Sequence, residues 1–174
     1  LLCNIYSSFS QRAYDEIIHD VALQHLPVVL CFDRAGLVGE DGATHHGCYD
    51  MADYRSIPGV IISSPRNETE LKNLMYTAAS TKTGPFIIRY PRGCGEGVDW
   101  KNVEVNVLEP GKGEKLQDGN VLSIIAAGPE ANRAMEAAAL VAERTGVTPA
   151  VYNIRYIKPL DEELVKEAAS KGMV

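Results

Sequence analysis

The chain has 174 residues, of which 45% are hydrophobic and 23% charged, and its formal net charge is −6. These values are close to the average for globular proteins and leave room for one domain or two small ones. The acidic balance and the lack of any Lys/Arg block argue against nucleic acid or an anionic membrane as the partner. No apolar run approaches the roughly 20 residues of a membrane span, and there is no signal peptide. We therefore expect a cytoplasmic protein.

The first hundred residues alternate apolar runs with helical patterns. Four apolar runs predict strands, at residues 1–6, 26–32, 60–63 and 84–89. Three segments predict helices, from Ser8 or Phe9 to about His25, at 50–55, and from Asn67 to about Ser80. Asn67, with Glu70 three residues on, predicts a capping box. This alternation predicts an α/β domain with a parallel sheet over residues 1–100.

The rest of the chain repeats the alternation after a polar stretch. Residues 101–118 predict a linker, with a weak strand signal at Val103–Val107. Two further strands are predicted, at 121–126 and 148–153. Two further helices are predicted, one from Pro129, as its first residue, to Thr145 and one from Asp161 to Ser170. Residues 119–174 thus predict the start of a second α/β domain, too short for a normal doubly wound one. The chain lacks an initiator methionine and ends as another strand begins, so we expect a piece of a longer polypeptide.

Residues 34–48, RAGLVGEDGATHHGC, form the most distinctive segment. They combine an arginine, two histidines, two acids, a hydroxyl and four glycines. Glycine permits positive φ and close backbone approach, and ionisable groups gathered in one loop often hold a polar ligand. Because the segment follows a predicted buried strand, we expect it at the carboxyl edge of the sheet, where open α/β sheets bind their ligands.

Three groups of chemically active side chains follow strands of the predicted sheet. They are Tyr6, Phe9 and Arg12; Arg34, Asp41 and His45; and Arg89 and Arg92. The loops after parallel strands share one edge, so we expect these groups to converge. Arginines with a tyrosine make a phosphate clamp, since guanidinium presents forked donors that match phosphate oxygens. An Asp and a His four residues apart can hold sugar hydroxyls or move protons.

Each of these residues also has a purely structural interpretation. The alternatives are an anchoring role for Phe9, pairing of Arg12 with Asp15 or Glu16, pairing of Arg34 with Asp33 or Glu40, and helix capping or domain bridging by Arg92. His45 and His46 do not make a metal site without a third ligand, and the four cysteines are scattered with no CxxC pair. We therefore expect no metal site in this chain.

Several segments resemble one enzyme family. They are IYSSFSQRAYD, DRAGLVGEDGATHHGCYD, RYPRG and YIKPLDEELV, and the resemblance extends over essentially the whole chain. GEDGATH is similar to transketolases generally, whereas YSSFSQRAYD, DRAGLVG and RYPRG are closer to the 1-deoxy-D-xylulose-5-phosphate synthase family. Both groups belong to the transketolase-like, thiamine-diphosphate-dependent enzymes. The resemblance implies a pyrimidine-binding domain followed by the first part of a C-terminal domain.

The resemblance also implies roles for particular side chains. They are cofactor-binding Phe9 and Arg12, substrate-binding Tyr6, Arg34 and Arg92, and catalytic Asp41 and His45. The cofactor-binding pair would lie against the aminopyrimidine of thiamine diphosphate, with Phe9 stacked on the ring. The substrate-binding group would grip the phosphate of glyceraldehyde 3-phosphate. The catalytic pair would contact the hydroxyl and carbonyl end of this aldehyde, with His45 as the proton-transfer group.

The complete enzyme of this family decarboxylates pyruvate and adds the two-carbon unit to glyceraldehyde 3-phosphate, for isoprenoid, thiamine and pyridoxal synthesis. The resemblance implies thiamine diphosphate and magnesium as cofactors and a homodimer as the assembly. The diphosphate and metal sites are not among the segments of this chain, so we expect the isolated chain to be inactive. Two alternatives stay open: the C-terminal subunit of a split transketolase, and a non-catalytic module that binds a sugar phosphate.

Overall fold

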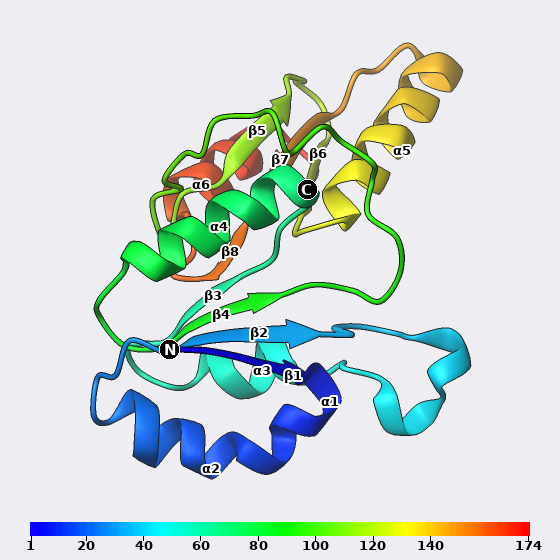
Figure 1. Cartoon of the computed structure of the whole chain (residues 1–174). Helices are drawn as coiled ribbons and strands as arrows, with labels where there is room; N and C mark the ends of the chain where they lie inside the picture. Colours follow the sequence, from blue (N-terminus) through cyan, green and yellow to red (C-terminus); the bar gives the residue numbers. More distant parts are fainter.

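The computed structural model describes residues 1–174, which form two sheets of unequal size (Figure 1). The larger sheet has five strands in the order β1-β2-β4-β3-β8, and the smaller has three in the order β5-β7-β6. The strands are β1 (Leu2–Tyr6), β2 (Val29–Asp33), β3 (Ile61–Ser63), β4 (Phe86–Arg89), β5 (Glu114–Gln117), β6 (Ser123–Ala126), β7 (Ala150–Asn153) and β8 (Tyr156–Lys158). Strands β1 to β4 pair in parallel, which confirms the predicted α/β class with a parallel sheet.

The larger sheet is covered on both faces. Leu30 and Phe32 of β2 belong to one apolar core, whereas Val29 and Cys31 belong to another, because successive side chains of a strand point to opposite faces. Residues 7–22 and α3 (Asp50–Arg55) cover the first face, and α4 (Glu68–Ser80) covers the second (Figure 1). A parallel sheet buried on both faces requires continuous apolar strands, which explains the uninterrupted run before the polar loop.

The predicted first helix is irregular. It consists of α1 (Ser7–Ser10), a 3-10 turn at Gln11–Ala13, α2 (Tyr14–Glu16) and a π-helical stretch at Ile17–Ala22, and it ends before His25. The break follows Ser10, whose carbonyl accepts a 2.6 Å hydrogen bond from the hydroxyl of Tyr54. That hydroxyl comes from α3 and is buried, which raises the pKa of Tyr54 to about 12. The predicted helix therefore forms over residues 7–22, ends about three residues earlier than predicted, and alternates between α, 3-10 and π turns.

The polar stretch 101–118 contains a strand in a different place from the one predicted. No strand forms at Val103–Val107, whereas β5 pairs antiparallel with β7. The backbone before β5 instead runs along α4 and is held by its side chains. Asn73 Oδ1 accepts the N–H of Asn106 at 3.0 Å, and Thr77 Oγ1 accepts the N–H of Leu108 at 2.8 Å. These side-chain partners replace the ladder that the weak alternation predicted.

Two helices flank the smaller sheet, α5 (Glu130–Thr145) and α6 (Glu162–Ser170) (Figure 1). Pro129 was predicted as the first helical residue of α5, but it is the N-cap, and the helix begins one position later at Glu130. Asp161 caps α6, since its side chain accepts the N–H of Leu164 at 3.1 Å. None of the helices combines the length and the apolar character needed to cross a membrane.

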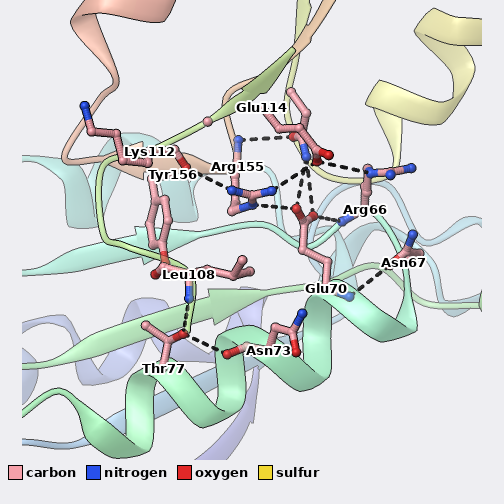
Figure 2. Close-up of polar contacts among 12 residues, drawn as sticks. Arg66, Asn67, Glu70, Asn73, Thr77, Leu108, Lys112, Glu114, Arg155 and Tyr156 are labelled. Atoms are coloured by element: carbon pink, nitrogen blue, oxygen red, sulfur yellow. Dashed lines mark hydrogen bonds and ion pairs between the residues drawn. The ribbon is translucent and has the colours of Figure 1, made fainter. Parts of the chain in front are cut away.

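Helix α4 begins with half of the predicted capping box. The side chain of Asn67 accepts the N–H of Glu70 at 2.9 Å, as expected. The carboxylate of Glu70 does not return to Asn67. It accepts the N–H of Arg66 and Nε of Arg155, each at 2.6 Å (Figure 2). A charged donor makes a stronger hydrogen bond than a backbone N–H. The carboxylate of Glu70 therefore binds Arg155 instead of completing the capping box with Asn67.

Arg155 joins the two halves of the chain. Its side chain is only 11% exposed and contacts Glu70, Glu114 at 3.1 Å and the carbonyl of Lys112 at 3.2 Å (Figure 2). The residues after it form β8, which pairs antiparallel with β3 and so extends the larger sheet. Strand β8 was not predicted, because three residues carry too little pattern to identify a strand.

Candidate functional site

The polar loop after β2 closes on itself at its base. Gly36 and Gly47 exchange backbone hydrogen bonds of 2.8 and 2.9 Å, so residues 37–46 form a closed excursion. Gly47 has no room for a Cβ atom, which would collide with the side chain of Ser7 and lie 2.7 Å from the carbonyl of Arg34. The N–H of Ala35 also binds the carbonyl of Tyr90, at 3.0 Å, which links this loop to the one after β4. The two loops therefore form one unit at the carboxyl edge of the sheet.

Two 3-10 turns inside the loop carry the predicted catalytic pair. Asp41 ends the first turn, Gly39–Asp41, and His45 ends the second, Ala43–His45. Between them Gly42 adopts φ 81°, a conformation that residues with a Cβ rarely reach. The glycine spacing that made this segment distinctive is thus required by its backbone.

Asp41 lies between two arginines that come from different strand ends. Its Oδ2 atom is 2.8 Å from Nε of Arg34 and 3.0 Å from Nε of Arg92. The hydrogen bond from Arg34 lowers the pKa of the Asp41 carboxyl, and the charge of Arg92 adds to this effect. One carboxylate therefore holds together two guanidinium groups that would otherwise repel each other.

Arg34 is fixed more firmly than Arg92. Its backbone adopts φ 56°, an uncommon value for a residue with a side chain. Its Nη1 donates to Asp33 at 3.1 Å, and its guanidinium carbon lies 4.0 Å from the centre of the Tyr6 ring. Such a cation–π contact is attractive. Of the two structural partners considered for Arg34, Asp33 and Glu40, the contact forms with Asp33.

An aromatic surface lies beside the arginines. The ring of Phe9 is stacked on that of Tyr6 with 5.2 Å between centroids, and His45 lies 5.2 Å from Phe9 and 5.9 Å from Tyr6. Phe9 is 45% exposed. An exposed phenyl ring next to polar groups can receive a flat ligand by stacking.

The two adjacent histidines have different surroundings. Nδ1 of His46 accepts the backbone N–H of Val38 at 3.1 Å, which places His46 in the scaffold of the loop. Nδ1 of His45 lies 2.9 Å from the hydroxyl of Thr44, and its ring faces the aromatic surface. The geometry thus separates a scaffold histidine from one that lies with the other predicted site residues.

The structure does not bring every expected residue into this cluster. Arg12 is exposed and makes no hydrogen bond or ion pair, and its expected pairing with Asp15 or Glu16 is absent as well. Arg89 pairs with the buried Asp50 at 2.8 Å and so fastens the end of the polar loop to β4. The pairing of Asp50 with Arg89 could not be predicted from the sequence, because the two residues are 39 positions apart.

The Asp41 carboxyl offers a direct test of this geometry. Its pKa is expected to lie below the ordinary value of 3.8, and Arg34→Ala should raise it, because the hydrogen bond from Arg34 is the largest cause of the shift. With a depressed folded-state pKa, the contribution of Asp41 to stability is present above its unfolded pKa and is lost as the pH falls. Carboxyl NMR titration measures the pKa, with Arg133→Ala as the control. An unchanged pKa in the Arg34 variant would contradict the assigned contact.

Each half of the chain matches a known protein family. Residues 1–96 match the transketolase pyrimidine-binding domain, and residues 111–173 match the transketolase C-terminal domain. The chain is 58% identical over 165 residues to the 1-deoxy-D-xylulose-5-phosphate synthase of Bacteroides thetaiotaomicron, covering 95% of this chain and 25% of that protein. It is 56% identical over 169 residues to the synthase of Parabacteroides distasonis, covering 97% and 26%. The chain thus spans about a quarter of the length of these curated relatives.

Solved structures agree with these family matches. A split-gene transketolase, described as an inactive beta4 tetramer, superposes with a TM-score of 0.84 at 27% identity, covering 98% of this chain and 54% of that one. A transketolase mutant from Pichia stipitis superposes with a TM-score of 0.77 at 21% identity, covering 96% and 25%, and shows the shared fold alone. The chain therefore belongs to the transketolase family, with a pyrimidine-binding domain followed by sequence of the C-terminal domain.

Proposed function

We propose that this chain provides the aldehyde-binding site of a 1-deoxy-D-xylulose-5-phosphate synthase, which condenses pyruvate with glyceraldehyde 3-phosphate and releases carbon dioxide. The observation that carries the proposal is the convergence of Arg34 and Arg92 on Asp41, beside the exposed ring of Phe9. The identity of 58% to a synthase of that name supports the choice of reaction. We also propose that the complete protein is a cytoplasmic homodimer, with units at residues 1–100 and 119–174 joined by 101–118.

The two arginines suit a phosphate group. Each uses Nε for Asp41, which leaves Nη2 of Arg34 and both Nη groups of Arg92 without an acceptor in the structure. Guanidinium nitrogens in this state match the oxygens of a phosphate in a forked geometry. Tyr6 lies against Arg34 and adds a hydroxyl to the same region. Asp41 keeps the two cations aligned before the phosphate arrives, so less ordering is needed on binding.

The aromatic surface fits one end of thiamine diphosphate. Phe9 would stack on the aminopyrimidine, and the half-exposed ring of Phe9 supports this role. Arg12, one helical turn after Phe9, would lie beside the aminopyrimidine. When bound, the cofactor supplies the carbanion chemistry that joins the two substrates. The structure contains no cluster of three or more His, Cys, Asp or Glu side chains that suits a metal ion, so we assign no residue of this chain to magnesium.

The catalytic pair is proposed to act at the aldehyde end of the substrate. With the phosphate at the arginines, Asp41 would accept a hydrogen bond from the aldehyde's hydroxyl group. His45 would deliver a proton to the aldehyde oxygen, since a histidine gains and loses protons near neutral pH. The polar loop places the His45 ring 5.2 Å from Phe9 and 5.9 Å from Tyr6, which supports this assignment.

A split transketolase is the second candidate. The split-gene transketolase covers 98% of this chain at 27% identity, so such a subunit shares the fold. That enzyme class transfers a ketol unit from a sugar phosphate and releases no carbon dioxide. The higher identity to the synthases favours the decarboxylating reaction.

Arg34→Ala and Arg92→Ala in the full-length protein should mainly weaken use of the phosphorylated aldehyde. Each change removes a charged hydrogen-bond donor, worth roughly 1.5–3 kcal/mol, which corresponds to about 10- to 150-fold in kcat/KM. Steady-state kinetics with both substrates should show an unchanged KM for pyruvate. Arg144→Ala, on the exposed end of α5, is the control. A higher KM for pyruvate with unchanged use of the aldehyde would contradict the phosphate site.

A further inference from the structure

Glu68, the first residue of α4, contacts the loop that follows Arg92. Its Oε1 atom accepts the N–H of Gly97 at 2.8 Å. Gly95 approaches the same carboxyl so closely that a Cβ atom there would collide with it. The other oxygen, Oε2, is buried and has no hydrogen-bond partner. A carboxylate in this position is a structural centre of the loop rather than a solvated surface charge.

The loop depends on this carboxylate for its shape. No other side chain in the structure hydrogen-bonds residues 93–97, and Gly93 and Gly97 adopt φ values of 133° and 79°. Such glycines leave the backbone conformationally free, so an external contact is needed to select one shape. The backbone N–H groups of Glu68 itself and of Gly97 lower the pKa of the Glu68 carboxyl.

The loop and α4 share a cavity with the arginine of the candidate site. The cavity has a volume of about 330 Å³, and its wall includes Glu68, Arg92 and Gly95. Arg92 itself is exposed and has one fixed contact, with Asp41 at 3.0 Å. Its position is therefore determined by Asp41 at the guanidinium and by the loop at the backbone. Glu68 holds the loop and so controls the position of the Arg92 backbone.

We propose that Glu68 is a positioning residue for Arg92, which holds the loop 93–97 so that the guanidinium group stays at the phosphate of the aldehyde. The inference rests on the proposed function, since it assigns Glu68 to the same substrate. It adds a residue from α4 that does not touch the substrate. The glycines at 93, 95 and 97 then have a specific purpose, because they wrap the backbone around this carboxylate.

The test uses the full-length protein with two acceptors, glyceraldehyde 3-phosphate and unphosphorylated glyceraldehyde. Glu68→Gln keeps the shape but removes the charge, and a charged hydrogen bond is stronger than a neutral one. We expect the KM for the phosphorylated acceptor to rise about five- to tenfold. The KM for pyruvate and the use of glyceraldehyde should stay the same. Gly95→Ala, which disturbs the contact from the loop side, should give the same selective change.

Glu162→Gln is the matched control, since Glu162 is also the first residue of a helix but is exposed and contacts only Lys166, at 3.7 Å. In an Arg92→Ala background, Glu68→Gln should add less than about twofold, because residues that act as a unit are not additive. An equal effect in both backgrounds, or an equal effect on both acceptors, would overturn the inference. If Arg92→Ala weakens use of the phosphorylated acceptor and Glu68→Gln does not, the inference alone is wrong. If Arg92→Ala has no effect, the proposed phosphate site is wrong as well.

Discussion

Replacing His45 by Asn is expected to reduce turnover of the full-length protein by about 10²-fold or more, the size typical for loss of a general acid or base. Asn keeps hydrogen bonding but does not titrate near neutral pH. His45 lies 5.2 Å from the Phe9 ring at the junction of the aromatic surface and the arginines. The measurement is the steady-state kcat with saturating pyruvate and glyceraldehyde 3-phosphate.

His46→Asn is the control for this result. Nδ1 of His46 accepts the N–H of Val38, and the side-chain oxygen of Asn can accept a similar hydrogen bond. We therefore expect turnover to fall by less than about tenfold at position 46. Equal losses at both positions, or a larger loss at 46, would reject the assignment of His45 as the proton-transfer residue.

Replacing Arg155 by Ala is expected to lower the free energy of local opening between α4 and the second half of the chain by about 3–5 kcal/mol, as for other broken buried ion pairs. The change leaves Glu70 buried, 6% exposed, without its charged partner (Figure 2). Native-state hydrogen exchange of the amides in α4 and β7 measures this opening free energy.

Arg133→Ala is the control, since Arg133 pairs with Glu130 on the surface of α5 at 2.6 Å. Such exposed pairs contribute about 0–1 kcal/mol. The double variant Glu70→Gln with Arg155→Met should recover part of the loss, because no unpaired charge stays buried. If the Arg155 and Arg133 variants lose the same amount, the Glu70–Arg155 pair does not join the two halves.

Much of the fold was predictable because its signals are local. Continuous apolar runs identified the four parallel strands, and Asn67 and Asp161 marked the starts of two helices. What the sequence did not reveal depends on partners far along the chain. The hydroxyl of Tyr54 donates to the carbonyl of Ser10, 44 residues earlier, and Arg155 binds Glu70, 85 residues earlier. No window of sequence contains both members of these pairs.

The candidate site divides in the same way. The glycine-rich segment 34–48 indicated a ligand loop, and its position at a strand end predicted the meeting of Arg34 with Arg92. That Asp41 lies between the two arginines emerges only in three dimensions. Glu68 was missed because its role depends on which loop packs against α4. The close approach of Gly95 to the Glu68 carboxyl is likewise visible only in the structure.

Release of carbon dioxide from the carboxyl carbon of pyruvate tests the account most directly. The full-length protein, supplied with thiamine diphosphate, magnesium and glyceraldehyde 3-phosphate, should release labelled carbon dioxide in amounts equal to the five-carbon sugar phosphate formed. Release should fall sharply in the Arg34→Ala and Arg92→Ala variants at low concentrations of the aldehyde. Transfer of a ketol unit from a sugar phosphate to the aldehyde, without carbon dioxide from pyruvate, would contradict the proposed reaction and indicate a transketolase.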